Sequence, residues 1–167
     1  MSAKSTNQLD GLDGPATSTA DKRGERALEV TVMSFGYKQG PPPLANVVFD
    51  VRFLKNPFWI EELRPLTGLD KPVQEYVLEQ PMAQDFLESL SSLLNRVLPK
   101  VVEHKVHHYI IALGCTGGQH RSTALVEALA ARLKENIPNC TVTIQHRELF
   151  NNAIATGATG QKEGDSK

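Results

Sequence analysis

Three segments of the chain alternate apolar and polar residues with the period of a strand that buries one face. In the first, residues 28–34, the apolar positions are Leu28, Val30 and Val32. The second, residues 46–53, has an apolar face made of Val47, Phe49, Val51 and Phe53. The third, residues 141–147, places on one side Val142, Ile144 and His146. A fourth strand is predicted over residues 109–113, because this run is continuously apolar, as in a central strand covered on both faces.

Three other segments repeat their apolar residues with the period of a helix. A short helix is predicted around residues 73–77. A longer one, residues 86–101, carries an apolar stripe of Phe86, Leu90, Leu93, Leu94, Val97 and Val101. Pro99 is expected to kink or restart this helix, because proline has no amide hydrogen to donate. A third helix follows residues 114–122, ends near Asn136 and buries Leu125, Val126, Leu129 and Leu133.

The order of these elements predicts the fold class. Strand 109–113, a Gly-rich turn, a helix and strand 141–147 form a βαβ unit, whose strands are expected to be parallel. We therefore expect a single α/β domain over residues 27–151, with helices packed on a small sheet. Residues 1–26 and 152–167 lack the apolar content of a core and are predicted to be disordered tails. Residues 54–72 are too long for a simple connector and rich in specific polar groups.

The Gly-rich loop after strand 109–113 has the chemistry of an anion site. Adjacent glycines let the backbone turn sharply and approach a ligand, and the next helix presents free N–H groups at its positive end. Hydroxyl, imidazole and guanidinium groups in the loop add donors. The expected contacts between Gly114 and Ser122 are Cys115, Thr116, Gly117, Gly118, His120, Arg121 and Ser122. The sequence thus predicts a phosphate site at the carboxyl edge of the sheet.

Two catalytic interpretations of this loop compete with simple binding. Gln119 and His120 stand where the NTPase loop G-x-x-x-x-G-K-[ST] requires Gly and Lys, so no NTPase activity is expected. Cys115, Arg121 and Ser122 match the C-x₅-R-[ST] pattern of cysteine phosphatases, in which a helix N-terminus activates the thiolate. Gly114 stands where those enzymes carry His, and a small packed cysteine is the alternative. We expect binding without catalysis.

Two features outside the loop also have structural alternatives. Asp50 and Arg52 share one strand face and could form no more than an ion pair. His146, on an apolar face, could be a core histidine with satisfied hydrogen bonds. The sequence leaves both alternatives open.

Composition narrows the function class only slightly. The 167 residues are 40% hydrophobic and 22% charged, as in ordinary soluble proteins, and the net charge of −1 neither supports nor excludes a nucleic acid. Cys115 and Cys140 are too few for a disulfide framework and lack metal-ligand spacing. The N-terminus has no signal-peptide core, and no run is long enough to span a bilayer. We expect a cytoplasmic protein without membrane contact, metal or cofactor.

Several separate motifs resemble, in the same order, the C-terminal domain of the RNase adapter protein family RapZ. The resemblance covers residues 34–148. Its motifs are SFGYK at 34–38, VFDVRFL at 48–54, NPFW at 56–59, LTGLDKPV at 66–73 and GCTGGQHRS at 114–122. Members of the family usually also carry an N-terminal nucleotide-binding P-loop domain, and this sequence is similar only to the domain that follows it.

The resemblance implies a sensor and adapter rather than a catalyst. In the family this domain binds glucosamine-6-phosphate and, in enterobacteria, small RNAs that it presents to an endoribonuclease. Matching positions imply ligand contacts from Arg52, Thr116, Gly117, Gly118, His120 and Arg121. Weaker candidates are Lys38, Asp50 and Asp70.

Two departures from enterobacterial members bear on this interpretation. Those proteins have His where this chain has Phe58, and they end in a basic tail that contacts RNA, whereas Leu149 to Asn152 here are uncharged. We therefore expect a phosphorylated amino sugar as the ligand. An RNA-binding adapter and a cysteine phosphatase are the alternatives, and a regulatory protein partner or a homo-oligomer stays open.

Overall fold

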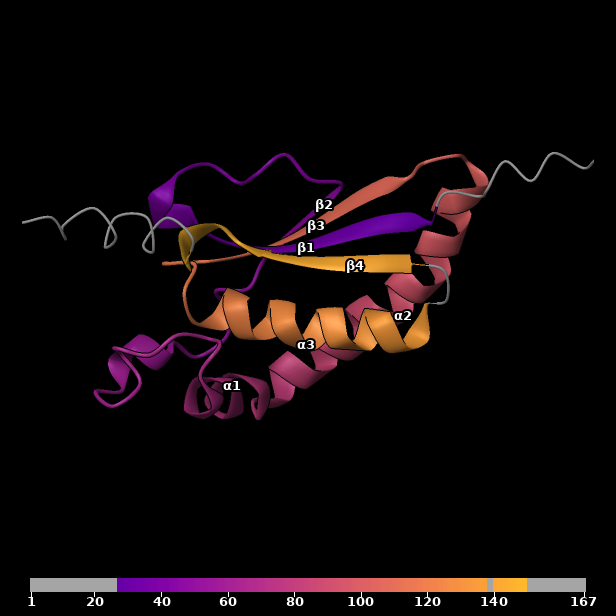
Figure 1. The fold of residues 1–167 in the computed structure, drawn as a ribbon. Coiled ribbons are helices and arrows are strands. Elements are labelled where there is room, and N and C mark those ends of the chain that lie inside the picture. Colours follow the sequence, from indigo (N-terminus) through magenta and orange to yellow (C-terminus); the bar gives the residue numbers. More distant parts are fainter. Residues whose placement is uncertain (1–26, 138–139, 150–167) are drawn as a thin grey trace, which may run out of the picture.

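Four parallel strands form one sheet in the order β2-β3-β1-β4, which confirms the predicted α/β class (Figure 1). The computed structural model describes residues 27–137 and 140–149. The strands are β1 (Leu28–Gly36), β2 (Val47–Asp50), β3 (His108–Cys115) and β4 (Cys140–His146). The helices are α1 (Lys71–Leu78), α2 (Pro81–Glu103) and α3 (Arg121–Asn136), with 3-10 turns η1 (Tyr37–Gln39) and η2 (Pro57–Trp59). The predicted tails lie outside the described residues.

The strand register explains why alternating apolar and polar residues correctly predicted the strands. Val32 lies beside Ile111 on β3 and Ile144 on β4, so the apolar positions of three strands share one face. That face meets α3, which packs against both β1 and β4, and α2 and α1 pack in turn on α3. The helices lie on one side of the sheet, and the connection over residues 37–46 runs along the other side (Figure 1).

The predicted βαβ unit is β3–α3–β4, and its two strands are parallel. They are not neighbours, however, because β1 lies between them and pairs with both. All four strands end on the same edge of the sheet, and α3 begins there (Figure 1). The loop between Cys115 and Arg121 is therefore at the carboxyl edge, where ligands of parallel sheets bind.

The second strand is shorter than predicted, because it ends at Asp50 rather than Phe53. The Asp50 carboxylate accepts a hydrogen bond from the Arg52 N–H, at 3.0 Å, which turns the chain out of the sheet. Val51 is still held, since its N–H donates to the carbonyl of Gly114, at 2.8 Å. Phe53 lies exposed beyond this turn, so its place in the apolar face expected over 46–53 was wrong, whereas Val51 is in the core and Phe49 packs against it.

The apolar stripe predicted for α2 is confirmed at Leu90 and Leu94, which belong to the core, and at Phe86 and Val101, which pack half-buried against it. The buried residues of this helix are Ala83, Leu87, Leu90, Ser91, Leu94 and Leu98. Leu93 is 45% exposed, and Phe86 packs edge-on against Phe49 at the side of the sheet. The helix is also continuous through Pro99 to Glu103, so it does not restart at the proline. Leu93 thus lies outside the face of the helix that the core covers.

The helices also bear on membrane contact. Within residues 27–137 and 140–149, none of them combines the length and the apolar character needed to cross a bilayer.

Candidate anion-binding site

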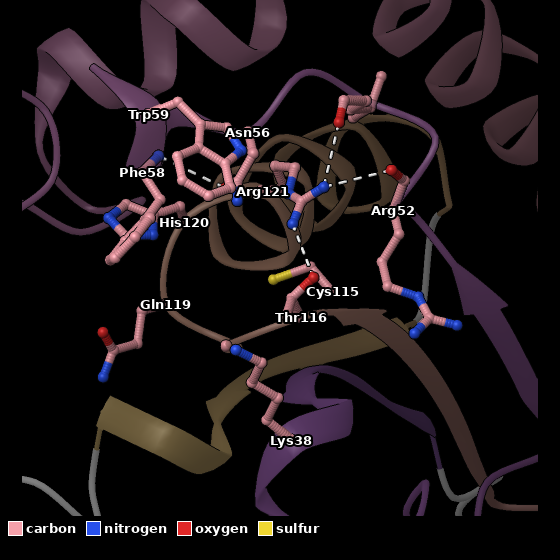
Figure 2. Close-up of a pocket in the computed structure, with 12 residues that line it drawn as sticks. Lys38, Arg52, Asn56, Phe58, Trp59, Cys115, Thr116, Gln119, His120 and Arg121 are labelled. Carbon is pink, nitrogen blue, oxygen red and sulfur yellow. Dashed lines mark hydrogen bonds between the residues drawn. The ribbon is translucent and has the colours of Figure 1, made fainter.

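A cavity of about 650 Å³ opens at the carboxyl edge of the sheet, beside the start of α3 (Figure 2). Three segments form it: the Gly-rich loop, the chain after β2, and Lys38 from η1. Its lining residues are Lys38, Arg52, Leu54, Asn56, Phe58, Trp59, Cys115, Thr116, Gly117, Gln119, His120 and Arg121. Three of them are lysine or arginine and none is a carboxylate, so the cavity favours an anion.

The loop takes its shape from close backbone packing. Gly118 has φ of +76°, a conformation that other residues adopt only with strain. A Cβ at this position would meet the Glu148 side chain and lie 2.7 Å from the amide nitrogen of Gly36. Gly117, by contrast, faces open space. The sequence therefore needs glycine at 118 for packing, and Gly117 leaves room for a ligand.

The N-terminus of α3 supplies oriented donors. Within the described residues, no side chain caps this terminus, where His120 occupies the N-cap position. The first N–H groups of the helix therefore point outward at the positive end of its dipole. A phosphate group next to Gly117 and Gln119 would find both charge and hydrogen-bond donors there.

Arg121 joins the loop to the chain after β2. It is only 4% exposed, and its NH1 donates to the carbonyls of Arg52, at 3.2 Å, and Leu54, at 3.1 Å. Its NH2 donates to the Thr116 hydroxyl, at 3.0 Å, and Nε is buried without a partner among the described residues (Figure 2). Arg121 thus builds the cavity wall while contributing its charge.

Arg52 brings a second, more accessible charge to the rim. Its guanidinium forms a two-point ion pair with the Asp50 carboxylate, with distances of 2.9 and 2.6 Å, and lies over the Tyr37 ring at 4.3 Å. The hydrogen bonds from Arg52 lower the pKa of Asp50 below its usual value. The structural alternative foreseen for this pair, an ion pair, is therefore present. Because it is solvent-exposed, the pair can open at small cost.

Cys115 and Ser122 face each other under the loop. Cys115 is 2% exposed, and its Sγ accepts the Gly118 N–H at 3.2 Å and lies 3.1 Å from the Ser122 hydroxyl. Ser122 is fully buried and also contacts the Phe35 carbonyl, at 3.5 Å. These contacts hold the loop from below.

The buried imidazole of His120 gives the site a pH-dependent component. Burial lowers its pKa below the ordinary 6.5, and neighbouring carbonyls, including those of Arg64 and Leu66, only partly oppose this. The neutral ring is therefore the form that the fold accommodates. Its Nε2 is buried and has no hydrogen-bond partner among residues 27–137 and 140–149.

We expect acid to destabilise the protein through His120. Below pH 6.5 the His120 side chain of the unfolded chain binds a proton that the folded chain does not bind. The free energy of unfolding therefore decreases as the pH is lowered, until the pH reaches the lowered pKa of His120 in the folded protein. Replacing His120 with Gln should flatten this slope between about pH 7 and pH 5. Urea unfolding at several pH values measures it. Equal slopes in both proteins would show that His120 does not contribute.

The structure brings most of the predicted ligand contacts together. Six of the eight predicted positions line the cavity: Arg52, Cys115, Thr116, Gly117, His120 and Arg121. Gly118 and Ser122 lie behind this wall. Of the weaker candidates, only Lys38 lines the cavity, whereas Asp70 accepts hydrogen bonds from the backbone and hydroxyl of Thr67, at 2.7 and 2.9 Å.

Sequence reasoning missed part of the cavity wall. Asn56, Trp59 and Gln119 also line it, and Trp59 is 77% exposed at the rim (Figure 2). The NPFW segment was the available signal, because it lies in residues 54–72, a stretch too long for a simple connector and rich in specific polar groups.

A clamp after β4 was also missed. The Glu148 carboxylate accepts the Gly36 N–H, at 3.1 Å, and Arg147 donates to the Gly36 and Pro41 carbonyls, at 2.9 and 2.8 Å. His146 is the core histidine foreseen as an alternative, bonded to Ser34 and to a carboxylate of α3, both at 2.8 Å. These residues fix the end of β1 under the loop.

Comparison with known proteins identifies the domain. A family model described as the RapZ C-terminal domain matches residues 28–150. The chain belongs to this family. The Gly-rich loop, the NPFW segment and the clamp all lie within the matched residues.

Relatives of the RapZ family are similar over most of this chain. A nucleotide-binding protein of Leifsonia xyli subsp. xyli is 50% identical over 122 residues, which is 73% of this chain and 41% of that protein. One from Acidothermus cellulolyticus is 45% identical over 141 residues, 83% of this chain and 45% of that protein. The chain spans less than half the length of the curated relatives that it matches.

Proposed function

We propose that this domain is a non-catalytic sensor that binds a phosphorylated amino sugar such as glucosamine-6-phosphate and reports it to a regulatory partner. One observation carries the proposal: a cavity with three cationic side chains and no carboxylate opens at the positive end of α3. Such a lining suits a dianionic phosphate and disfavours a cation.

The phosphate anchors the ligand in this proposal. It binds beside Gly117 and the first turn of α3, where Lys38 and Arg52 supply mobile charge. The rest of the ligand then extends toward Asn56, whose amide can bond a hydroxyl group, and Trp59, whose ring can cover an apolar sugar face. With no carboxylate in the lining, the amino group contributes less than the phosphate.

The environment of Cys115 supports binding without turnover. The side chain is only 2% exposed, so a phosphate group in the cavity has little access to its sulfur. Arg121, which would hold the phosphoryl group in a cysteine phosphatase, is tied to two backbone carbonyls. We therefore assign Cys115 a structural role, and expect Cys115→Ser to keep ligand affinity.

Ligand binding can be reported through the segment after β2. Gly68 donates its N–H to the Gln119 carbonyl, at 2.7 Å, so the loop and residues 54–70 move together. Phe58 and Trp59 lie in this segment with exposed rings. A ligand that orders the cavity thereby sets the surface that these rings present to a partner.

Calorimetry on matched variants tests the proposal. We expect micromolar binding of glucosamine-6-phosphate, none of glucosamine, and affinities about tenfold weaker in Lys38→Ala and Arg52→Ala because each loses one charge. Lys55→Ala is the control, since Lys55 is exposed nearby but does not line the cavity. No heat with a panel of sugar phosphates, or equal losses in Lys55→Ala, would contradict the proposed site.

The exposed rings favour one alternative, an RNA-binding adapter. Phe58 and Trp59 pack edge-on, with centroids 5.6 Å apart, beside the cationic rim, and bases stack on such platforms. Binding of single-stranded RNA that weakens steeply with salt and is lost in Trp59→Ala would support this function. The wild-type chain separates the two functions, because a sensor should bind glucosamine-6-phosphate without binding single-stranded RNA.

A further inference from the structure

A chain of buried polar side chains lies behind the Gly-rich loop, between β1, β4 and α3. Ser34 and Thr123 are fully buried, and His146 is 7% exposed. The Ser34 hydroxyl lies 2.8 Å from Nδ1 of His146 and 3.4 Å from the Thr123 hydroxyl. Nε2 of His146 lies 2.8 Å from the Glu127 carboxylate. Burying hydroxyl groups costs free energy that apolar side chains of the same size would not, so this chain points to a role beyond filling space.

The chain of side chains ends at the carbonyl of Gly118. Thr123 donates its hydroxyl hydrogen to this carbonyl, at 3.0 Å. The acceptor lies five residues back, whereas a helical threonine ordinarily bonds to a carbonyl three or four residues back. The carbonyl four residues back, that of Gln119, already accepts the N–H of Gly68, at 2.7 Å. The occupied Gln119 carbonyl and the Ser34 hydroxyl behind Thr123 therefore favour the bond to Gly118.

The orientation of the Gly118 carbonyl sets the direction of the next backbone donor. In a trans peptide unit the C=O and the following N–H are coplanar and point in opposite directions. The N–H of Gln119 therefore points away from Thr123, and no hydrogen bond among the described residues uses it. The Gly118 N–H, by contrast, donates to the Cys115 sulfur, at 3.2 Å. Because Gln119 lines the cavity, its N–H is the one of these two donors that remains for an anion.

We propose that Thr123 is a positioning residue for anion binding: it holds the Gly118 carbonyl so that the Gln119 N–H faces the phosphate of the ligand. Ser34, which His146 holds in place, keeps the Thr123 hydroxyl from turning away. This role, which rests on the proposed function, adds a backbone donor that is oriented before the ligand arrives. The ligand then gains a hydrogen bond without having to reorganise the loop, and its affinity rises.

Substitutions at Thr123 test this role with inorganic phosphate as the probe, because the donor acts on the anion alone. Thr123→Val keeps the shape of the side chain without its hydroxyl, and should weaken phosphate binding about tenfold by releasing the Gly118 carbonyl. Thr123→Ser keeps the hydroxyl and should bind phosphate about as tightly as the wild type. Thr143→Val, at an exposed position of β4, is the matched control and should change nothing. Thermal melts verify that each variant is folded.

Ser34→Ala tests the support behind Thr123. Alone, it should weaken phosphate binding by about threefold, because the Thr123 hydroxyl loses its neighbour. In the Thr123→Val background it should have no further effect, since both side chains act through the same hydrogen bond. Losses that add up in the double variant would show that Ser34 does not act through Thr123.

Amide NMR identifies the donor directly and separates this role from the proposed function. Phosphate should shift the Gln119 amide proton strongly in the wild type and weakly in Thr123→Val. An unshifted Gln119 amide in the wild type would overturn the positioning role. So would a Thr123→Val variant that loses stability but keeps its phosphate affinity, because the residue would then be structural only. A Gln119 amide that responds to phosphate in a protein that binds glucosamine-6-phosphate no more tightly would support the role of Thr123 and contradict the sugar sensor.

Discussion

Arg121→Ala is expected to cost the protein both its ligand affinity and about 3 kcal/mol of its free energy of unfolding. The side chain is buried, and its loss leaves the carbonyls of Arg52 and Leu54 without their donor and opens a void between the loop and the chain after β2. Urea unfolding measures the stability term, and calorimetry with glucosamine-6-phosphate measures the binding term at a temperature where the variant is folded.

Two matched variants show which property of Arg121 matters. Arg132→Ala, on the same helix, removes an exposed guanidinium bonded only to Gln84 among the described residues, and should cost less than about 1 kcal/mol. Arg121→Lys keeps the charge but cannot reach three acceptors at once, so most of the stability loss should remain. A fully stable Arg121→Lys would show that charge alone holds the loop.

Gly118→Ala is expected to destabilise the fold by about 2–4 kcal/mol, combining left-handed backbone strain with a steric clash. The new Cβ meets the Glu148 side chain and the backbone of Gly36, and the backbone cannot give way without moving β1. Because the loop would shift, ligand affinity should fall as well. Thermal or urea unfolding of the variant provides the measurement.

Gly117→Ala is the matched control for this prediction. The neighbouring glycine has no positive φ, and a Cβ there meets open space, so its stability should change by less than about 0.5 kcal/mol. The added methyl group would project toward the ligand, so affinity can fall without loss of stability. Comparable destabilisation by the two substitutions would mean that the loop tolerates rearrangement and that its packing is not decisive.

Local sequence patterns predicted the helices and strands well wherever the buried positions repeat with the period of a strand or a helix. Alternation in residues 28–34 is confirmed because β1 is covered by helices on one face only. The third helix ends at Asn136 as expected, before the proline at 138. The helical period gave the wrong outcome for Leu93, which is 45% exposed, because the core covers a narrower face of α2 that is centred on Leu90 and Leu94.

The candidate site was only partly predictable for a related reason. The sequence of a loop between a strand and a helix shows directly which hydrogen-bond donors the loop carries. Four cavity residues could therefore be found from the sequence, namely Thr116, Gly117, His120 and Arg121. Asn56 and Trp59 reach the cavity from a segment sixty residues away in the chain. No local sequence pattern shows that this segment lies next to the loop. Its position depends on the hydrogen bond that Arg121 donates to the Leu54 carbonyl.

By itself, the sequence determined the α/β class, the position of the anion loop and membership of the RapZ C-terminal family, because these depend on local period, glycine placement and ordered motifs. Only the tertiary structure decided which residues of the loop line the cavity and which lie behind it. Gly118 and Ser122 are buried behind the cavity wall, and Arg121 both carries a positive charge and donates hydrogen bonds to the chain after β2. The physical reason is that burial and hydrogen-bond partners are set by segments distant in the chain, which a local pattern does not record.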